Sequence, residues 1–192
     1  MSFATLQPFL YFLLGAVVLI AWAKEVQQRK IKASAEGFWP GTTSSSLASV
    51  LLSVSGILLI TLAESCVEIR YHVAHEQTSL AAIALLSLLG AAVVEEIVFR
   101  GFVAPAHLTG LKLLMVVLIG SAVFALFHGF NLSTTQGKIS FIFAFLTSVW
   151  LYFARFNPLN SQRSLLPSLV GHCVRNLAVF GIKWAQGFIT FH

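Results

Sequence analysis

Residues Ser79–Arg100 read SLAAIALLSLLGAAVVEEIVFR, an apolar run that ends in two adjacent glutamates and an arginine. A helix needs about 20 apolar residues to cross a bilayer, and this run has that length. A charged side chain at the centre of such a helix costs about 2.5 to 3.5 kcal/mol, so charges there are rare and tend to mark a site inside the bundle. The stretch therefore predicts a membrane helix that carries a functional polar group.

The composition of the whole chain agrees with a membrane protein. Of its 192 residues, 57% are hydrophobic and 10% are charged, whereas soluble domains carry about a quarter charged residues. Apolar blocks of spanning length recur at 3–23, 44–63, 79–99, 111–127, 139–154 and 165–185. We expect an all-α polytopic membrane helix bundle of about six transmembrane helices, folded as one domain over residues 1–192.

The distribution of basic residues predicts the orientation. The first apolar block is followed by a basic segment, residues 24–32, and has no basic residues before it, as expected of a retained anchor and not of a cleaved signal peptide. The positive-inside rule places this segment in the cytoplasm, together with Arg100, Lys112, Arg155 and Arg163. We expect a multi-pass protein of the plasma or inner membrane. Topology accounts for the net charge of +5, which requires no nucleic-acid partner.

Helical spacing gives the two glutamates different surroundings. Glu96 and Arg100 are four residues apart and share a helix face, whereas Glu95 points about 100° away. Arg100 can therefore neutralise Glu96, which leaves Glu95 free for another role. The alternative is a helix end whose charges reach out to the interface, but Phe99 and Phe102 keep the helix apolar beyond the charges.

Two other apolar blocks carry polar side chains at the same spacing. Phe124 and His128 are four residues apart near the end of the fourth block, and His172 and Asn176 are four apart in the sixth. We expect these groups to meet the glutamates in one polar cavity within the membrane. A carboxylate beside an imidazole can take a proton from water. Histidine and asparagine N–H groups can stabilise an oxyanion, so the set suits amide hydrolysis by an activated water.

These three motifs, in this order on separate spans, resemble those of the CAAX protease and bacteriocin-processing family, which are intramembrane endopeptidases similar to type II CAAX prenyl endopeptidases. The resemblance covers Ser79 to about Trp184. It implies that residues 79–184 form the catalytic core, and that residues 1–78 hold two N-terminal spans and their loops.

The resemblance also implies a role for each site residue. The expected catalytic residues are Glu95, Glu96, His128, His172 and Asn176, with Arg100 and Phe124 in support. Glu95 and His128 would activate the water, while His172 and Asn176 would form the oxyanion hole. Glu96 and Arg100 would be the structural pair.

A cofactor is a separate question. The family has also been described as metal-dependent, and Glu95, His128 and His172 could ligate Zn²⁺. We favour a metal-free mechanism without a cofactor, because the oxyanion role uses the remaining polar residues without requiring a cation. In the loop that follows the second block, His72 and His75 lack the HExxH order of a zinc protease.

The expected partners are the lipid bilayer and a membrane-associated protein or peptide substrate. The chain is shorter than the larger eukaryotic members of the family, so its substrate need not be a prenylated CAAX tail. One alternative is a non-catalytic scaffold or bacteriocin-immunity-type protein that retains the protease fold. Another is a proton relay built from the intramembrane glutamate and histidine, although the chain has no inverted repeat to support a transporter.

Overall fold

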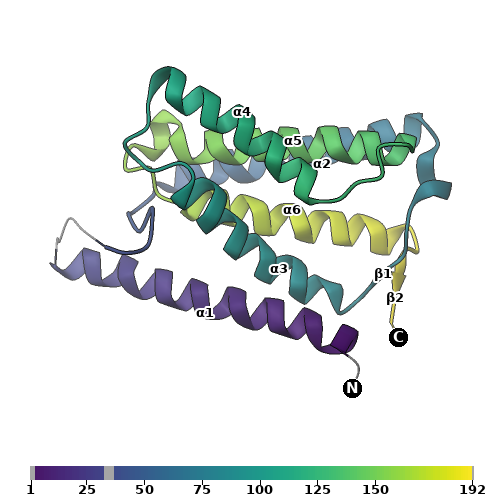
Figure 1. Ribbon diagram of the computed structural model, residues 1–192, viewed down its shortest axis with the longest axis horizontal. Coiled ribbons are helices and arrows are strands. Elements are labelled where there is room, and N and C mark those ends of the chain that lie inside the picture. The colour runs from purple at the N-terminus through teal and green to yellow at the C-terminus, as the bar shows by residue number, and fades with distance from the viewer. Residues whose placement is uncertain (1–2, 33–36, 192) are drawn as a thin grey trace.

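Six α-helices of 12 to 30 residues dominate the computed structural model, which describes residues 3–32 and 37–191 (Figure 1). The elements are, in chain order, α1 (Phe3–Lys32), α2 (Leu47–Arg70), η1 (Val73–Glu76), β1 (Leu80–Ala81), α3 (Ala84–Glu95), η2 (Glu96–Phe102), α4 (Gly110–Phe127), α5 (Thr135–Phe156), η3 (Pro158–Asn160), α6 (Leu166–Ala185) and β2 (Ile189–Thr190). The predicted all-α class is therefore confirmed. The described residues also contain two short strands, β1 and β2, which the sequence did not predict.

Four helices of the described chain are long and apolar enough to cross a membrane: residues Leu6–Arg29 of α1, and the whole of α2, α4 and α5. Large apolar side chains on these helices face outward, among them Leu13, Val17, Leu59 and Leu62. Lipid can cover such a surface, whereas exposure of so large an apolar surface to water would be unfavourable. The count of six spans stays a prediction for α3 and α6, the two helices that carry the central polar residues.

Helix α3 lies between α1 and α6 (Figure 1). It crosses α1 at Gly15 and Gly90, where a Cβ atom added to Gly15 would lie 2.5 Å from the Gly90 backbone. Small residues allow such close approach, which is how membrane helices gain packing energy without a hydrophobic driving force. A buried apolar cluster joins α1, α3, η2 and α6 through Trp22, Val93, Ile97, Leu165 and Leu169.

The N-terminal end of α3 differs from the predicted boundary. The sequence predicts a third span that begins at Ser79, but the helix begins at Ala84 because Leu80 and Ala81 form β1 instead. This strand pairs in parallel with β2, with Leu80 opposite Ile189 and Ala81 opposite Thr190. Hydropathy alone cannot separate a short strand from the first turn of a helix. The pairing ties the start of α3 to the segment after α6.

Candidate active site

The two glutamates lie where the helix changes its winding. Glu95 is the last residue of α3, and Glu96 begins η2, a π-helical segment of seven residues. In a π-helix each N–H bonds the carbonyl five residues earlier, and such segments often occur at functional sites. The Val103 N–H closes this segment by donating to the Val98 carbonyl over 2.9 Å.

A chain of four charged or polar groups runs from the core towards the surface. Arg100 Nη1 lies 3.0 Å from Glu96 Oε1, and the same oxygen lies 2.9 Å from His172 Nδ1. On the other side of the ring, His172 Nε2 lies 3.7 Å from Glu95 Oε2. Because an ion-paired carboxylate can only accept, Nδ1–H donates to Glu96. Nε2 is then the ring atom that faces Glu95.

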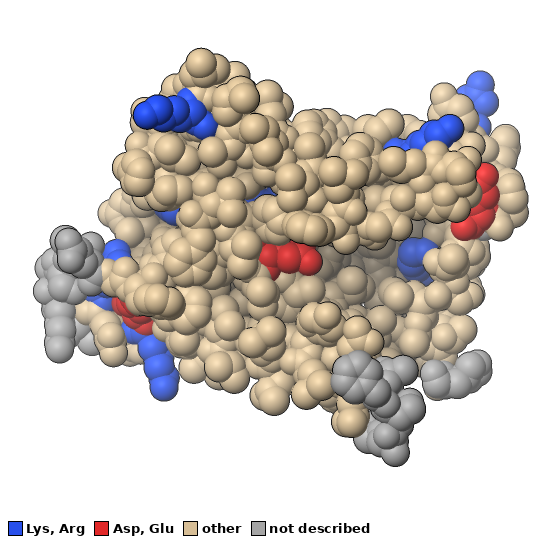
Figure 2. Space-filling view, in the orientation of Figure 1, with Lys and Arg blue, Asp and Glu red and all other residues tan. Residues whose placement is uncertain are grey.

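Burial separates the two carboxylates. The Glu96 and Arg100 side chains are fully buried, whereas the Glu95 side chain is 31% exposed. Acidic surface is visible in the middle of the face drawn in Figure 2, surrounded by uncharged residues. Glu96 therefore has no access to solvent, and Glu95 is the carboxylate that can meet a water molecule.

Aromatic rings enclose the buried guanidinium. The Arg100 Cζ atom lies 4.6 Å from the centroid of the Phe124 ring and 4.9 Å from that of Tyr152. A guanidinium over an aromatic face gains about 2 kcal/mol or more when it is desolvated. Phe124 also meets the His172 ring edge to face, at 5.8 Å between centroids. Phe124 therefore supports both the ion pair and the imidazole.

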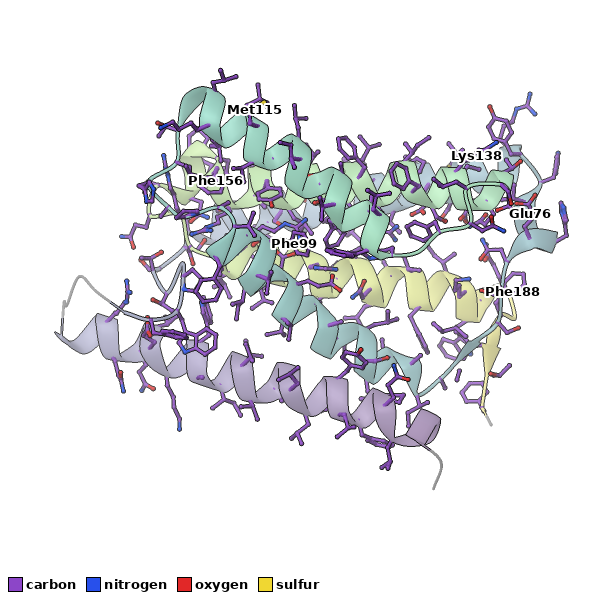
Figure 3. All side chains as sticks on the ribbon, viewed as in Figure 1. Glu76, Phe99, Met115, Lys138, Phe156 and Phe188 are labelled. Carbon is purple, nitrogen blue, oxygen red and sulfur yellow. The ribbon has the colours of Figure 1, made fainter. Side chains whose placement is uncertain are left out.

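A cavity of about 220 Å³ opens beside Glu95 and is also lined by Phe99, Phe124, Phe127 and His128. Figure 3 shows Phe99 between the α3–η2 helix and α4. The walls are thus aromatic, with one carboxylate and one imidazole as polar groups. Such a cavity can bind an apolar segment next to a carboxylate and an imidazole, both of which can transfer protons.

His128 is held at the C-terminal end of α4. Its Nδ1 lies 2.8 Å from the Phe124 carbonyl, which fixes the ring against the helix end. The ring stacks on Phe130 with 5.5 Å between centroids. Nε2 is left to interact with a substrate or a water. His128 and Glu95 thus line one cavity from two helices, without a direct hydrogen bond between them in the described residues.

Asn176 lies one turn after His172 on α6. Its Nδ2 donates to the Leu88 carbonyl over 2.8 Å, which links α6 to α3. Leu88 precedes Glu95 by about two helical turns. The structure therefore brings Glu95, Glu96, Arg100 and His172 into one chain of contacts, and directs one amide hydrogen of Asn176 to the helix backbone instead.

The candidate zinc ligands do not gather around one point. Within residues 3–32 and 37–191, no three His, Cys, Asp or Glu side chains lie close enough together to hold a metal ion. Glu95 and His172 are near each other, and the bond from Nδ1 to Glu96 leaves Nε2 of this imidazole free, but no third ligand in the described residues joins them. The set Glu95, His128 and His172 does not fit a zinc site in this arrangement.

Sequence reasoning missed two residues on α5 that contact the site. Ser148 accepts a hydrogen bond from Arg100, and Tyr152 donates one to the Phe99 carbonyl. Both are buried. The available signal was a polar residue every three or four positions in an apolar block, because polar residues in membrane helices usually face the bundle interior.

A family model described as type II CAAX prenyl endopeptidase Rce1-like matches residues 77–178, just over half of the chain. The chain belongs to this family. The matched segment runs from just before β1 to the middle of α6 and includes all the residues of the site. The predicted family is therefore confirmed, and the chain is a multi-pass membrane protein of this endopeptidase family. No match was found among curated proteins or among solved structures.

Proposed function

We propose that this type II CAAX prenyl endopeptidase-like protein is an intramembrane endopeptidase that hydrolyses a peptide bond with a water activated by Glu95. One observation carries the proposal: Glu95 combines partial exposure with a position on an aromatic cavity that also holds His128. The Nε2 atom of His172 lies 3.7 Å from the Glu95 carboxylate. Family membership supports hydrolysis of a peptide bond.

In the proposed reaction, the Glu95 carboxylate takes a proton from water while the water oxygen attacks the carbonyl carbon of the scissile bond. His128, through its Nε2 atom, orients the water. The protonated Glu95 then gives its proton to the amide nitrogen as the carbon–nitrogen bond breaks. The products are a carboxylic acid and an amine, and Glu95 returns to its starting form. A general base that becomes a general acid contributes about 10² to 10⁴ in rate.

His172 is the proposed donor to the oxyanion. Its Nδ1 is bound to Glu96, so the hydrogen bond to the developing negative charge comes from Nε2–H of the protonated ring. Asn176 has two amide hydrogens, and one of them is bound to Leu88. The second can donate to the same oxyanion when the substrate is in place. Loss of one such donor costs about 10² to 10³ in kcat.

The proposed substrate is a membrane-associated protein or peptide with an apolar segment at the scissile bond. Support comes from the cavity walls, since Phe99, Phe124 and Phe127 account for most of the lining. Phe127 is 78% exposed, so the cavity opens at an apolar surface at the end of α4. Ligand-binding pockets are typically lined by apolar side chains and contain a few polar groups that orient the ligand.

Substitution of Glu95 tests the proposal. We expect purified Glu95→Gln protein in lipid nanodiscs to cleave a quenched apolar peptide at least 100-fold more slowly than wild type. Glu68→Gln is the matched control, because Glu68 lies at the end of α2 on a different cavity; it should retain wild-type activity. Full activity of Glu95→Gln would refute the proposed base.

Two further measurements separate the alternatives. If the water mechanism holds, activity survives dialysis against a strong chelator, and bound zinc stays well below one ion per chain. The second measurement uses cells that lack the protein. If the protein is a non-catalytic scaffold, the Glu95→Gln chain restores the phenotype of these cells. The protease role predicts that it does not.

A further inference from the structure

Three polar side chains on α5 face the π-helical segment η2. Ser148, Tyr152 and Arg155 are spaced four and three residues apart, which places them along one face of the helix. All three are fully buried in this predominantly apolar helix. Each bonds a group in or directly after η2, and we name them together the α5 stripe.

The first member of the stripe holds the buried guanidinium. Arg100 Nη2 donates to the Ser148 hydroxyl over 2.6 Å and to the Ser148 carbonyl over 3.2 Å. Its other terminal nitrogen binds Glu96. One planar guanidinium therefore connects α5 to the carboxylate that holds His172. A shift of Ser148 would be transmitted through Arg100 and Glu96 to the imidazole.

The other two members bind backbone carbonyls at the end of η2. The Tyr152 hydroxyl donates to the Phe99 carbonyl over 3.0 Å, while Arg155 Nη1 donates to the Ala104 carbonyl over 2.7 Å and to that of Gly101 over 3.4 Å. The last carbonyls of a helix have no partner within it. An unbonded buried carbonyl is costly, so these side chains stabilise a helix end at this position.

We propose that the α5 stripe is a set of positioning residues that fixes the π-helical winding of η2 and thereby sets the Glu95–His172 geometry. The winding sets where Arg100 lies relative to Glu96, and Glu96 in turn holds His172 next to Glu95. The stripe does not line the cavity beside Glu95. Its effect on the rate rests on the proposed function, whereas its effect on geometry does not.

Kinetics provide the first test. Ser148→Ala removes the shorter bond to Arg100, and Tyr152→Phe removes the bond to the Phe99 carbonyl but keeps the ring over the guanidinium. We expect each variant to lower kcat about tenfold and to leave KM unchanged. Loss of one hydrogen bond to a charged or buried group shifts an equilibrium by about this factor. Ser148→Thr keeps a hydroxyl and should recover most of the rate.

Thr147→Val is the matched control. Thr147 is the neighbour of Ser148 on α5, and its buried hydroxyl bonds no group in the described residues. Removal of this hydroxyl should leave kcat and KM as in wild type. If Ser148→Ala and Tyr152→Phe both keep the wild-type kcat, or if they raise KM with kcat unchanged, the positioning role is overturned.

A spectroscopic test does not depend on activity. In protein labelled with ¹⁵N-arginine, the fixed guanidinium of Arg100 should give separate Nη signals, which Arg100→Met identifies by their loss. We expect Ser148→Ala to merge or broaden these signals and Thr147→Val to leave them unchanged. Unaltered signals in Ser148→Ala would overturn the inference. If wild type cleaves no peptide but the signals respond as expected, the proposed function fails and the positioning inference stands.

Discussion

Replacement of Arg100 by methionine would measure how strongly the bundle depends on its central ion pair. Arg100 and Glu96 are both fully buried and lie 3.0 Å apart. Removal of one partner from a buried pair leaves an uncompensated charge, which costs about 3 to 5 kcal/mol. We expect Arg100→Met to lower the free energy of unfolding by this amount, because the buried Glu96 carboxylate would lose the guanidinium that neutralises it and keep its hydrogen bond to His172.

A second substitution isolates the charge term from the loss of packing. Glu96→Gln removes the negative charge but keeps an oxygen that can accept from His172. The double variant, Arg100→Met with Glu96→Gln, no longer buries an unpaired charge. It should be less destabilised than the sum of the two single variants by about 2 kcal/mol, within the range of coupling between residues in contact.

The assay is reversible unfolding by SDS in mixed micelles, followed by far-ultraviolet circular dichroism. Arg70→Met serves as control, because Arg70 is exposed at the end of α2, and it should change the free energy of unfolding by less than about 0.5 kcal/mol. A cost below about 1 kcal/mol for Arg100→Met, well under the range for a broken buried pair, would refute the reasoning. Additive single and double variants would refute it as well.

Three other variants test separate features. Gly90→Ala would push a Cβ atom to 2.2 Å from the α1 backbone and should destabilise the protein by about 1 to 3 kcal/mol in the same SDS titration, whereas Gly181→Ala meets no neighbour within 4 Å and should not destabilise it. His128→Ala should lower peptide cleavage by about 10²-fold with little change in unfolding, since the residue is exposed. Asn176→Ala removes the bond to Leu88, so it should lower both kcat and, by about 1 kcal/mol, the free energy of unfolding; unchanged stability would contradict this link.

The sequence was sufficient to predict the helix bundle, because apolar blocks of spanning length leave few alternatives to a helix. The spacing of Glu96 and Arg100 likewise indicated which glutamate would be paired. Nothing in the sequence signalled the π-helical winding, since seven residues fit a bond to the fourth or the fifth preceding carbonyl equally well. Long-range pairs such as Glu96 with His172 could not be predicted from the sequence either, because they depend on how α6 is rotated against α3.

The role expected of Arg155 shows the same limit. The positive-inside rule predicts this arginine on the cytoplasmic side, where a charged side chain normally reaches water. In the fold it is fully buried, and its guanidinium binds the carbonyls of Gly101 and Ala104. Hydropathy reports the cost of a charge in an apolar segment but not the partners that compensate for it.

The hydrogen bond from His172 Nδ1 to Glu96 restricts proton movement in the bundle. The Glu96 carboxylate is sealed from solvent and neutralised by Arg100, so it offers no exit towards the core. Any hydrogen ion that the imidazole gains or gives up must pass through Nε2, on the same side as Glu95. Proton transfer is thereby confined to the side of the ring on which bond cleavage is proposed, and it does not reach the buried Glu96–Arg100 pair.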